Sequence, residues 1–176
     1  MRKLPKIILQ DEFELLLKHT LKMKHKQKKQ YALAILLAFE AGLRISEIVG
    51  LDGRVPALTK DKINLDHHTI RIEDGKGKKD RIVPLPKRVN ANAVKLLPIL
   101  LSRRSLQRYV TEIGGGLLGK KITFHTLRHG FGSHLAAMGR PLHEIMMLMG
   151  HTRLDTTGIY LHANPTNAIE GARDVF

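Results

Sequence analysis

The residues best suited to chemistry gather between residues 124 and 160. His125 and Arg128 stand three residues apart, so on a helix they would project from the same face. His151 follows a glycine, and Tyr160 comes nine residues later. A guanidinium holds phosphate oxygens bidentately, an imidazole moves protons, and a phenol attacks phosphorus once a base or cation assists it. These residue types predict phosphoryl transfer at a DNA backbone.

Two further cations stand upstream, each with two readings. Arg44 follows an apolar stretch, where an unpaired charge would be costly. It is either a surface arginine paired with Glu47, or a second guanidinium that joins Arg128 at one phosphate. Lys76 lies between two glycines in a lysine-rich segment. It is either part of an exposed basic tip or a lysine that reaches into a groove, since flanking glycines allow such a turn to move.

Tyr160 taken alone would most simply be a helix tyrosine with its ring in the core. A phenol has an ordinary pKa of about 10 and needs assistance to act as a nucleophile. Tyr31 and Tyr109 are the competing tyrosines, but neither follows a Gly-His pair at this distance. The chain has 10 histidines without a His-Glu-x-x-His motif or paired-ligand spacing, so we predict no metal site.

The charge balance predicts a polyanionic partner. The chain has 30 Lys and Arg against 16 Asp and Glu, which gives a net charge of +14. Nucleic acid is favoured over an anionic membrane because aromatic residues make up only 5% and Trp is absent. The longest apolar run, Tyr31 to Phe39, is too short to cross a bilayer. The chain has no cysteine and no secretory signal pattern, which favours a cytoplasmic protein.

The periodicity predicts an α+β fold that is mainly α-helical with a small antiparallel β-sheet. Two β-branched, alternating runs flank the lysine-rich turn and predict a hairpin with strands 69–73 and 81–85. Loops are predicted at 52–62 and at the triple glycine 114–116. The expected helices cover residues 11–19, 31–41, 45–51, 91–114 with a break at Pro98, 126–138, 142–149 and 152–161.

The order Arg, Lys, His-x-x-Arg, Gly-His and Tyr resembles the tyrosine recombinase family, which includes the phage integrases and Xer proteins. The match runs from about residue 4 to about residue 165. The resemblance implies that Tyr160 is the nucleophile and that His125 assists its deprotonation. It also implies that His151 hydrogen-bonds the phosphate and that Lys76 protonates the leaving 5′ oxygen.

The resemblance further implies that Arg44 and Arg128 stabilise the charge on phosphorus. Glu47 matches an acidic family position and is expected to orient Arg44 or His125. A carboxylate that touched the phosphate would repel it. Three further basic residues are expected to bind DNA, namely Lys78, Lys79 and Arg81.

A chain of this kind is expected to cleave and rejoin double-stranded DNA through a 3′-phosphotyrosine, without metal, ATP or another cofactor. The alternatives are a type IB topoisomerase-like enzyme and a catalytically silent duplex-binding module. We expect one catalytic domain over residues 1–176, without the N-terminal core-binding domain of the family, and no membrane association. Without DNA we expect a monomer, because nothing else in the sequence suggests a large apolar interface, and the resemblance implies a tetramer on DNA. An apolar stripe in 167–175 is expected to pack either on its own domain or on a neighbour, and the resemblance favours the neighbour.

Overall fold

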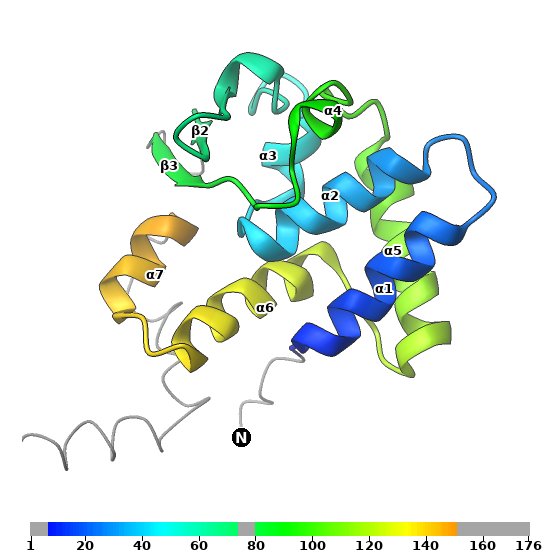
Figure 1. Cartoon of the computed structure of the whole chain (residues 1–176). Helices are drawn as coiled ribbons and strands as arrows, with labels where there is room; N and C mark the ends of the chain where they lie inside the picture. The colour runs from blue at the N-terminus through cyan, green and yellow to red at the C-terminus, as the bar shows by residue number, and fades with distance from the viewer. Residues whose placement is uncertain (1–6, 74–79, 151–176) are drawn as a thin grey trace, which may run out of the picture.

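The computed structural model describes residues 7–73 and 80–150. Within these ranges the chain forms seven α-helices and a three-stranded antiparallel sheet (Figure 1). The helices are α1 (Gln10–Lys22), α2 (Lys28–Glu40), α3 (Ile45–Val49), α4 (Ala91–Val94), α5 (Arg103–Leu118), α6 (Phe124–Ala137) and α7 (Leu142–Met149). The strands are β1 (Ile63–Asn64), β2 (Thr69–Ile72) and β3 (Arg81–Pro84), preceded by a 3₁₀ turn at Lys60–Lys62. The predicted fold class is confirmed.

Helix α2 lies at the centre of the core and packs against α1, α3 and α6 (Figure 1). Every residue from Tyr31 to Phe39 is buried, as expected for a helix that is apolar on all sides. The ring of Phe39 stacks on Phe13 of α1 with 4.1 Å between ring centroids. The chain therefore has a buried central helix that ends shortly before Arg44.

Gly42 ends this helical segment and turns the chain toward Arg44. Its φ is +65°, a left-handed conformation that glycine adopts without strain. A Cβ at this position would also lie 2.4 Å from Cδ1 of Phe131 in α6. Glycine is required here both for the turn and for the close approach of α6.

The sheet has the order β1-β2-β3, and β2 and β3 form the predicted hairpin. Ile72 pairs with Arg81, the first residue of β3, and Thr69 pairs with Pro84. Ile70, Ile72 and Val83 are buried against the helices. The loop predicted at 52–62 also contains the 3₁₀ turn, and its Val55 forms a bridge with Leu51 directly before it.

The prediction of a loop at the triple glycine is wrong, because α5 continues through residues 114–116 and ends at Gly119. A Cβ on Gly114 would lie 2.6 Å from the side chain of Ile122, so this glycine lets the following chain pack against the helix. The predicted break at Pro98 lies between α4 and α5, and it extends from Lys95 to Ser102. Ser102 caps α5 by accepting a hydrogen bond from the backbone N–H of Ser105.

Helix α6 begins at Phe124, two residues before the predicted start, because the Thr123 hydroxyl accepts a hydrogen bond from the backbone N–H of Thr126. Helix α7 matches the prediction and ends at Gly150, with φ of +59°. The helix expected at 152–161 and the stripe in 167–175 lie outside the described residues. None of the helices in 7–73 and 80–150 is long and apolar enough to cross a membrane.

Candidate active site

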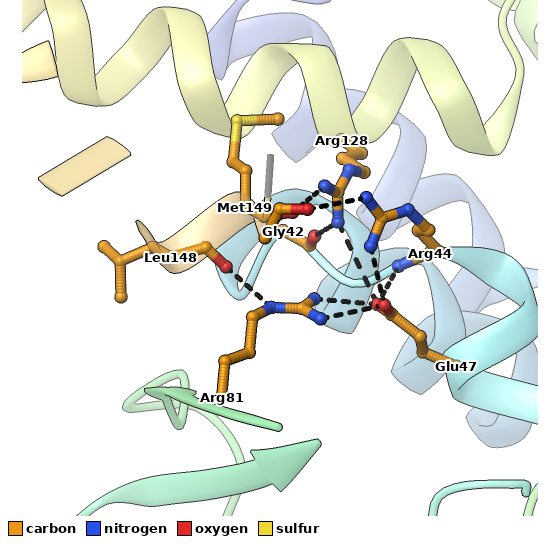
Figure 2. A network of polar contacts seen from close by, with 8 residues as sticks. Gly42, Arg44, Glu47, Arg81, Arg128, Leu148 and Met149 are labelled. Carbon is orange, nitrogen blue, oxygen red and sulfur yellow. Dashed lines mark hydrogen bonds and ion pairs between the residues drawn. The ribbon is translucent and has the colours of Figure 1, made fainter. Parts of the chain in front are cut away.

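Glu47 is the centre of a cluster of three arginines (Figure 2). It lies in the first turn of α3, and its Oε2 accepts a hydrogen bond of 2.8 Å from the backbone N–H of Arg44, which precedes the helix. Its Oε1 accepts a second bond of 2.8 Å from Nη1 of the Arg44 side chain. One acidic residue at this helix start therefore fixes both the backbone and the guanidinium of Arg44. Arg44, Glu47, Arg81 and Arg128 are called the arginine cluster below.

Arg81 approaches the same carboxylate from β3. Its Nη1 and Nη2 donate to the two oxygens of Glu47 at 2.9 and 2.8 Å. The side chains are 7% and 2% exposed, so the pair is buried. The guanidinium of Arg81, a residue expected to bind DNA, therefore has its hydrogen-bond partners within the protein. Alternation along the strand did not predict this, since Arg81 opens β3 next to a turn where a solvent-facing arginine is common.

Arg128 enters the cluster from α6, where it is 3% exposed. Its Nη1 donates to the carbonyl of Gly42 at 2.5 Å and lies 3.9 Å from Oε2 of Glu47. Its Nη2 donates to the carbonyl of Met149. The arginine of the His-x-x-Arg motif therefore joins the start of α3 to the end of α7.

The last carbonyls of α7 each accept from a different arginine. Leu148 accepts from Nε of Arg81 at 2.9 Å, and Gly150 accepts from Nη2 of Arg44 at 3.2 Å. Met149, between them, accepts from Arg128. The C-terminal end of a helix carries partial negative charge, so three guanidinium groups stabilise it there. The arginine cluster thus holds the chain immediately before His151.

The pKa of Glu47 shows which effect dominates in the cluster. Burial alone would raise this pKa, but the hydrogen bonds and charges of Arg81 and Arg44 outweigh it and lower the pKa to about 2. Glu47 is therefore ionised at neutral pH. Among the four residues, three positive charges and one negative charge leave a formal charge of +2, which suits an anion.

His125 lies on α6, one turn before Arg128, and is close enough to Arg128 and Arg44 for their charges to affect it. Burial, then the charge of Arg128, then that of Arg44, lower the pKa of His125. Its Nε2 lies 2.7 Å from Nε2 of His129, so one ring donates a hydrogen bond and the other accepts it. The i,i+4 spacing of His125 and His129 on one helix is the sequence signal that predicts this contact.

The structure brings Arg44, Glu47 and Arg128 together, and His125 is close enough for their charges to act on it. The other predicted residues lie outside the described residues, namely Lys76, Lys78, Lys79, His151 and Tyr160. The described chain shortly after Lys79 and the described chain directly before His151 nevertheless meet at the cluster, through Arg81 and Gly150. Among residues 7–73 and 80–150, no group of three His, Cys, Asp or Glu side chains could hold a metal ion.

A groove of about 1030 Å³ runs between α3 and the first half of α5. Its charged lining consists of four basic residues, Arg103, Arg104, Arg108 and Lys121, and two acidic ones, Asp52 and Glu112. Ile45 and Val49 of α3 form part of its wall, so the helix that presents Arg44 also borders the groove. Basic side chains gathered along one groove are typical of proteins that track a phosphate backbone.

Arginines from three separate segments surround one carboxylate, and the groove borders the same helix α3. The chain belongs to the phage integrase family, which it matches over residues 6–167. It is 32% identical to the tyrosine recombinase XerA of Thermococcus kodakarensis over 90% of this chain. That alignment covers 58% of XerA, so the chain spans little more than half of this relative.

Solved structures show the same fold. The recombinase XerH bound to its difH substrate in a pre-cleavage complex aligns with a TM-score of 0.72 and 25% identity. The alignment covers 97% of this chain and 54% of XerH. The catalytic domain of bacteriophage HP1 integrase aligns with a TM-score of 0.64 over 95% of this chain and 93% of that domain, at 21% identity. The described chain therefore has the fold of a tyrosine recombinase catalytic domain.

Proposed function

We propose that this chain is the catalytic part of a site-specific DNA recombinase that cleaves and rejoins strands through a phosphotyrosine. The observation that carries the proposal is the arginine cluster, in which Glu47 holds Arg44 beside Arg128. Family membership and the likeness to XerH bound to difH support double-stranded DNA as the partner.

In the proposed reaction the Tyr160 oxygen attacks the scissile phosphorus in line with the leaving 5′ oxygen. The phenolic proton leaves with the help of His125, and the new bond is a 3′-phosphotyrosine. Arg44, Arg128 and His151 stabilise the negative charge that develops on the non-bridging oxygens. Lys76 donates a proton to the departing 5′ oxygen. Lys78 and Lys79 contact the DNA beside it.

The covalent link retains the phosphodiester energy, so a 5′ hydroxyl of another strand can reverse the reaction on a new partner. The step requires no ATP, because no net bond energy is lost. The arginine cluster supplies the positive charge that metal ions supply in many nucleases. Site-specific exchange also requires several copies on one DNA, and we propose that copies of the chain form a tetramer there but remain monomeric without DNA. This activity belongs in the cytoplasm, on the DNA of a cell or of a mobile element.

A duplex with a nick close to the cleavage site tests the proposal, because the short cleaved fragment diffuses away and traps the covalent complex. The wild-type chain should give a protein–DNA adduct that migrates slowly in a denaturing gel. Tyr160→Phe should give none while binding the duplex within a few fold, since most affinity comes from phosphate contacts.

Tyr109→Phe is the matched control and should form the adduct, because the Tyr109 hydroxyl donates to Thr20 at 3.0 Å in the core. Absence of an adduct with the wild-type chain would favour a silent duplex-binding module. Relaxation of supercoiled DNA without strand exchange would favour a topoisomerase-like enzyme.

A further inference from the structure

We propose that Arg81 is a positioning residue that neutralises Glu47, so that the carboxylate orients Arg44 without competing with a bound phosphate. This inference rests on the proposed function and deepens it. Arg81 touches no reacting atom in this account. It acts through Glu47.

The geometry of the pair fits this role. Arg81 uses both terminal nitrogens of its guanidinium, at 2.9 and 2.8 Å, one for each carboxylate oxygen. Such a planar fork fixes the orientation of the carboxylate, which a lysine ammonium cannot do. The pair is buried, so water does not screen it as it would a surface pair. Glu47 therefore has one defined orientation in which it accepts from Arg44.

The charges explain why a third arginine is needed. Glu47 lies 2.8 Å from Nη1 of Arg44 and 3.9 Å from Nη1 of Arg128. Without Arg81, the negative charge of Glu47 would be balanced by these two guanidinium groups alone, and the formal charge of the arginine cluster would fall from +2 to +1. A phosphate would then compete with Glu47 for the same donors.

Arg81 also joins the elements that carry the other predicted catalytic residues. It opens β3, directly after the hairpin segment that contains Lys76, and its Nε donates to Leu148 near the end of α7 at 2.9 Å. A Cβ on Gly150 would lie 3.2 Å from Cδ of Arg81, so the two segments are in close contact. One side chain thus ties the hairpin, the start of α3 and the chain before His151 to each other.

The test is a cycle of three variants, Arg81→Met, Glu47→Gln and the double variant, with adduct formation measured at saturating nicked duplex. Arg81→Met should slow adduct formation by about tenfold or more, less than the roughly 10²–10³-fold loss typical of a donor that contacts the reacting group. The double variant removes the uncompensated carboxylate together with the arginine. It should therefore react faster than Arg81→Met by about threefold or more.

Arg88→Met is the matched control. Arg88 also pairs with two carboxylates, Glu14 and Glu40, but it lies against α1 and α2. Its variant should keep the rate of adduct formation within about twofold, because loss of an ion pair outside the site affects stability rather than chemistry. Arg81→Lys, which keeps the charge without the fork, should react at a rate between those of the wild type and Arg81→Met.

A purely structural role for Arg81 predicts the opposite order. Loss of both partners would then leave the double variant no faster than Arg81→Met, and its rate would follow the decrease in thermal midpoint. That result would overturn the inference, as would a rate for Arg81→Met within about twofold of the wild type.

Failure of the proposed function would be recognised separately, because the wild-type chain would then form no adduct. The inference would in that case be judged by the binding of inorganic phosphate, measured by ³¹P NMR titration. Arg81→Met should bind phosphate more weakly than the wild type, and the double variant should regain affinity. Equal affinity of Arg81→Met and the wild type would contradict the role assigned to Arg81.

Discussion

His125 and His129 share a hydrogen bond between their Nε2 atoms, which lie 2.7 Å apart on the same face of α6. The rings meet edge to face, with 4.2 Å between their centroids. Burial, the charge of His125 and that of Arg128 lower the pKa of His129 from 6.5 to about 4. The predicted catalytic histidine is therefore held by a neighbour that favours the neutral form of the pair.

This pair makes stability depend on pH in a defined window. Between pH 6.5 and about 4 the unfolded chain binds a proton at His129 that the folded chain does not bind. The part of the free energy of unfolding that depends on neutral His129 is therefore fully present above pH 6.5 and is lost as the pH falls toward about 4. Urea unfolding at several pH values measures the slope. His129→Leu should make the slope shallower between pH 6.5 and 5.5, and an unchanged slope would contradict the assignment.

Gly42→Ala should destabilise the chain more than the same change at Gly53. Both glycines have positive φ, +65° and +62°, so both substitutions introduce backbone strain of roughly 1–2 kcal/mol. Only the Cβ at Gly42 would meet another side chain, that of Phe131 at 2.4 Å, while nothing lies within 4 Å of the Cβ at Gly53. The excess loss at Gly42 should be about 1–3 kcal/mol in denaturant unfolding. Equal losses in the free energy of unfolding at the two positions would contradict this expectation, because they would show that the Phe131 ring moves aside at little cost.

The triple glycine of α5 offers a test of opposite signs. Gly115→Ala should stabilise the chain by about 0.5–1 kcal/mol, because alanine is the better helix former and its Cβ would meet nothing within 4 Å. Gly114→Ala should destabilise it, since its Cβ would lie 2.6 Å from Ile122. Denaturant unfolding of both variants and of the wild type measures the two changes in the free energy of unfolding. Destabilisation by Gly115→Ala would indicate that α5 does not continue through these glycines.

Lys76→Ala should slow cleavage of an ordinary phosphodiester far more than cleavage of one whose leaving 5′ oxygen is replaced by sulfur. A thiolate leaves without protonation, so it does not need a general acid. Adduct formation on matched nicked duplexes measures both rates. Equal losses on the two substrates would remove Lys76 from this role, and the same comparison with Lys78→Ala and Lys79→Ala would then identify the acid.

The sequence predicted those helices and strands whose local pattern favours the same structure as their tertiary packing does. The apolar run of α2 ends at Gly42 as predicted, and the alternating strands around the lysine-rich turn form the hairpin. The prediction of a loop at the triple glycine is wrong because local propensity favours a loop there, whereas packing of Gly114 against Ile122 favours the helix. Such a contact joins residues from separate elements and leaves no periodic pattern.

The candidate site was predictable in part for the same reason. Arg44 and Glu47 lie within one helical turn, so their pairing followed from spacing, and the structure shows both a pair and a place in a larger cluster. The partner of Arg81 is 34 residues away in the sequence, and no local pattern connects the two. The Arg81 side chain is buried because β3 lies beside α3 and α7, an arrangement that no local sequence pattern predicts (Figure 2).

The central claim is that Tyr160 becomes covalently attached to DNA at a site activated by the arginine cluster. The most direct measurement is mass spectrometry of the tryptic peptide that carries DNA after reaction with a nicked duplex. We expect a 3′-phosphate ester on Tyr160, in the peptide spanning residues 154–173. A DNA-linked peptide that contains Tyr31 or Tyr109 instead would contradict it.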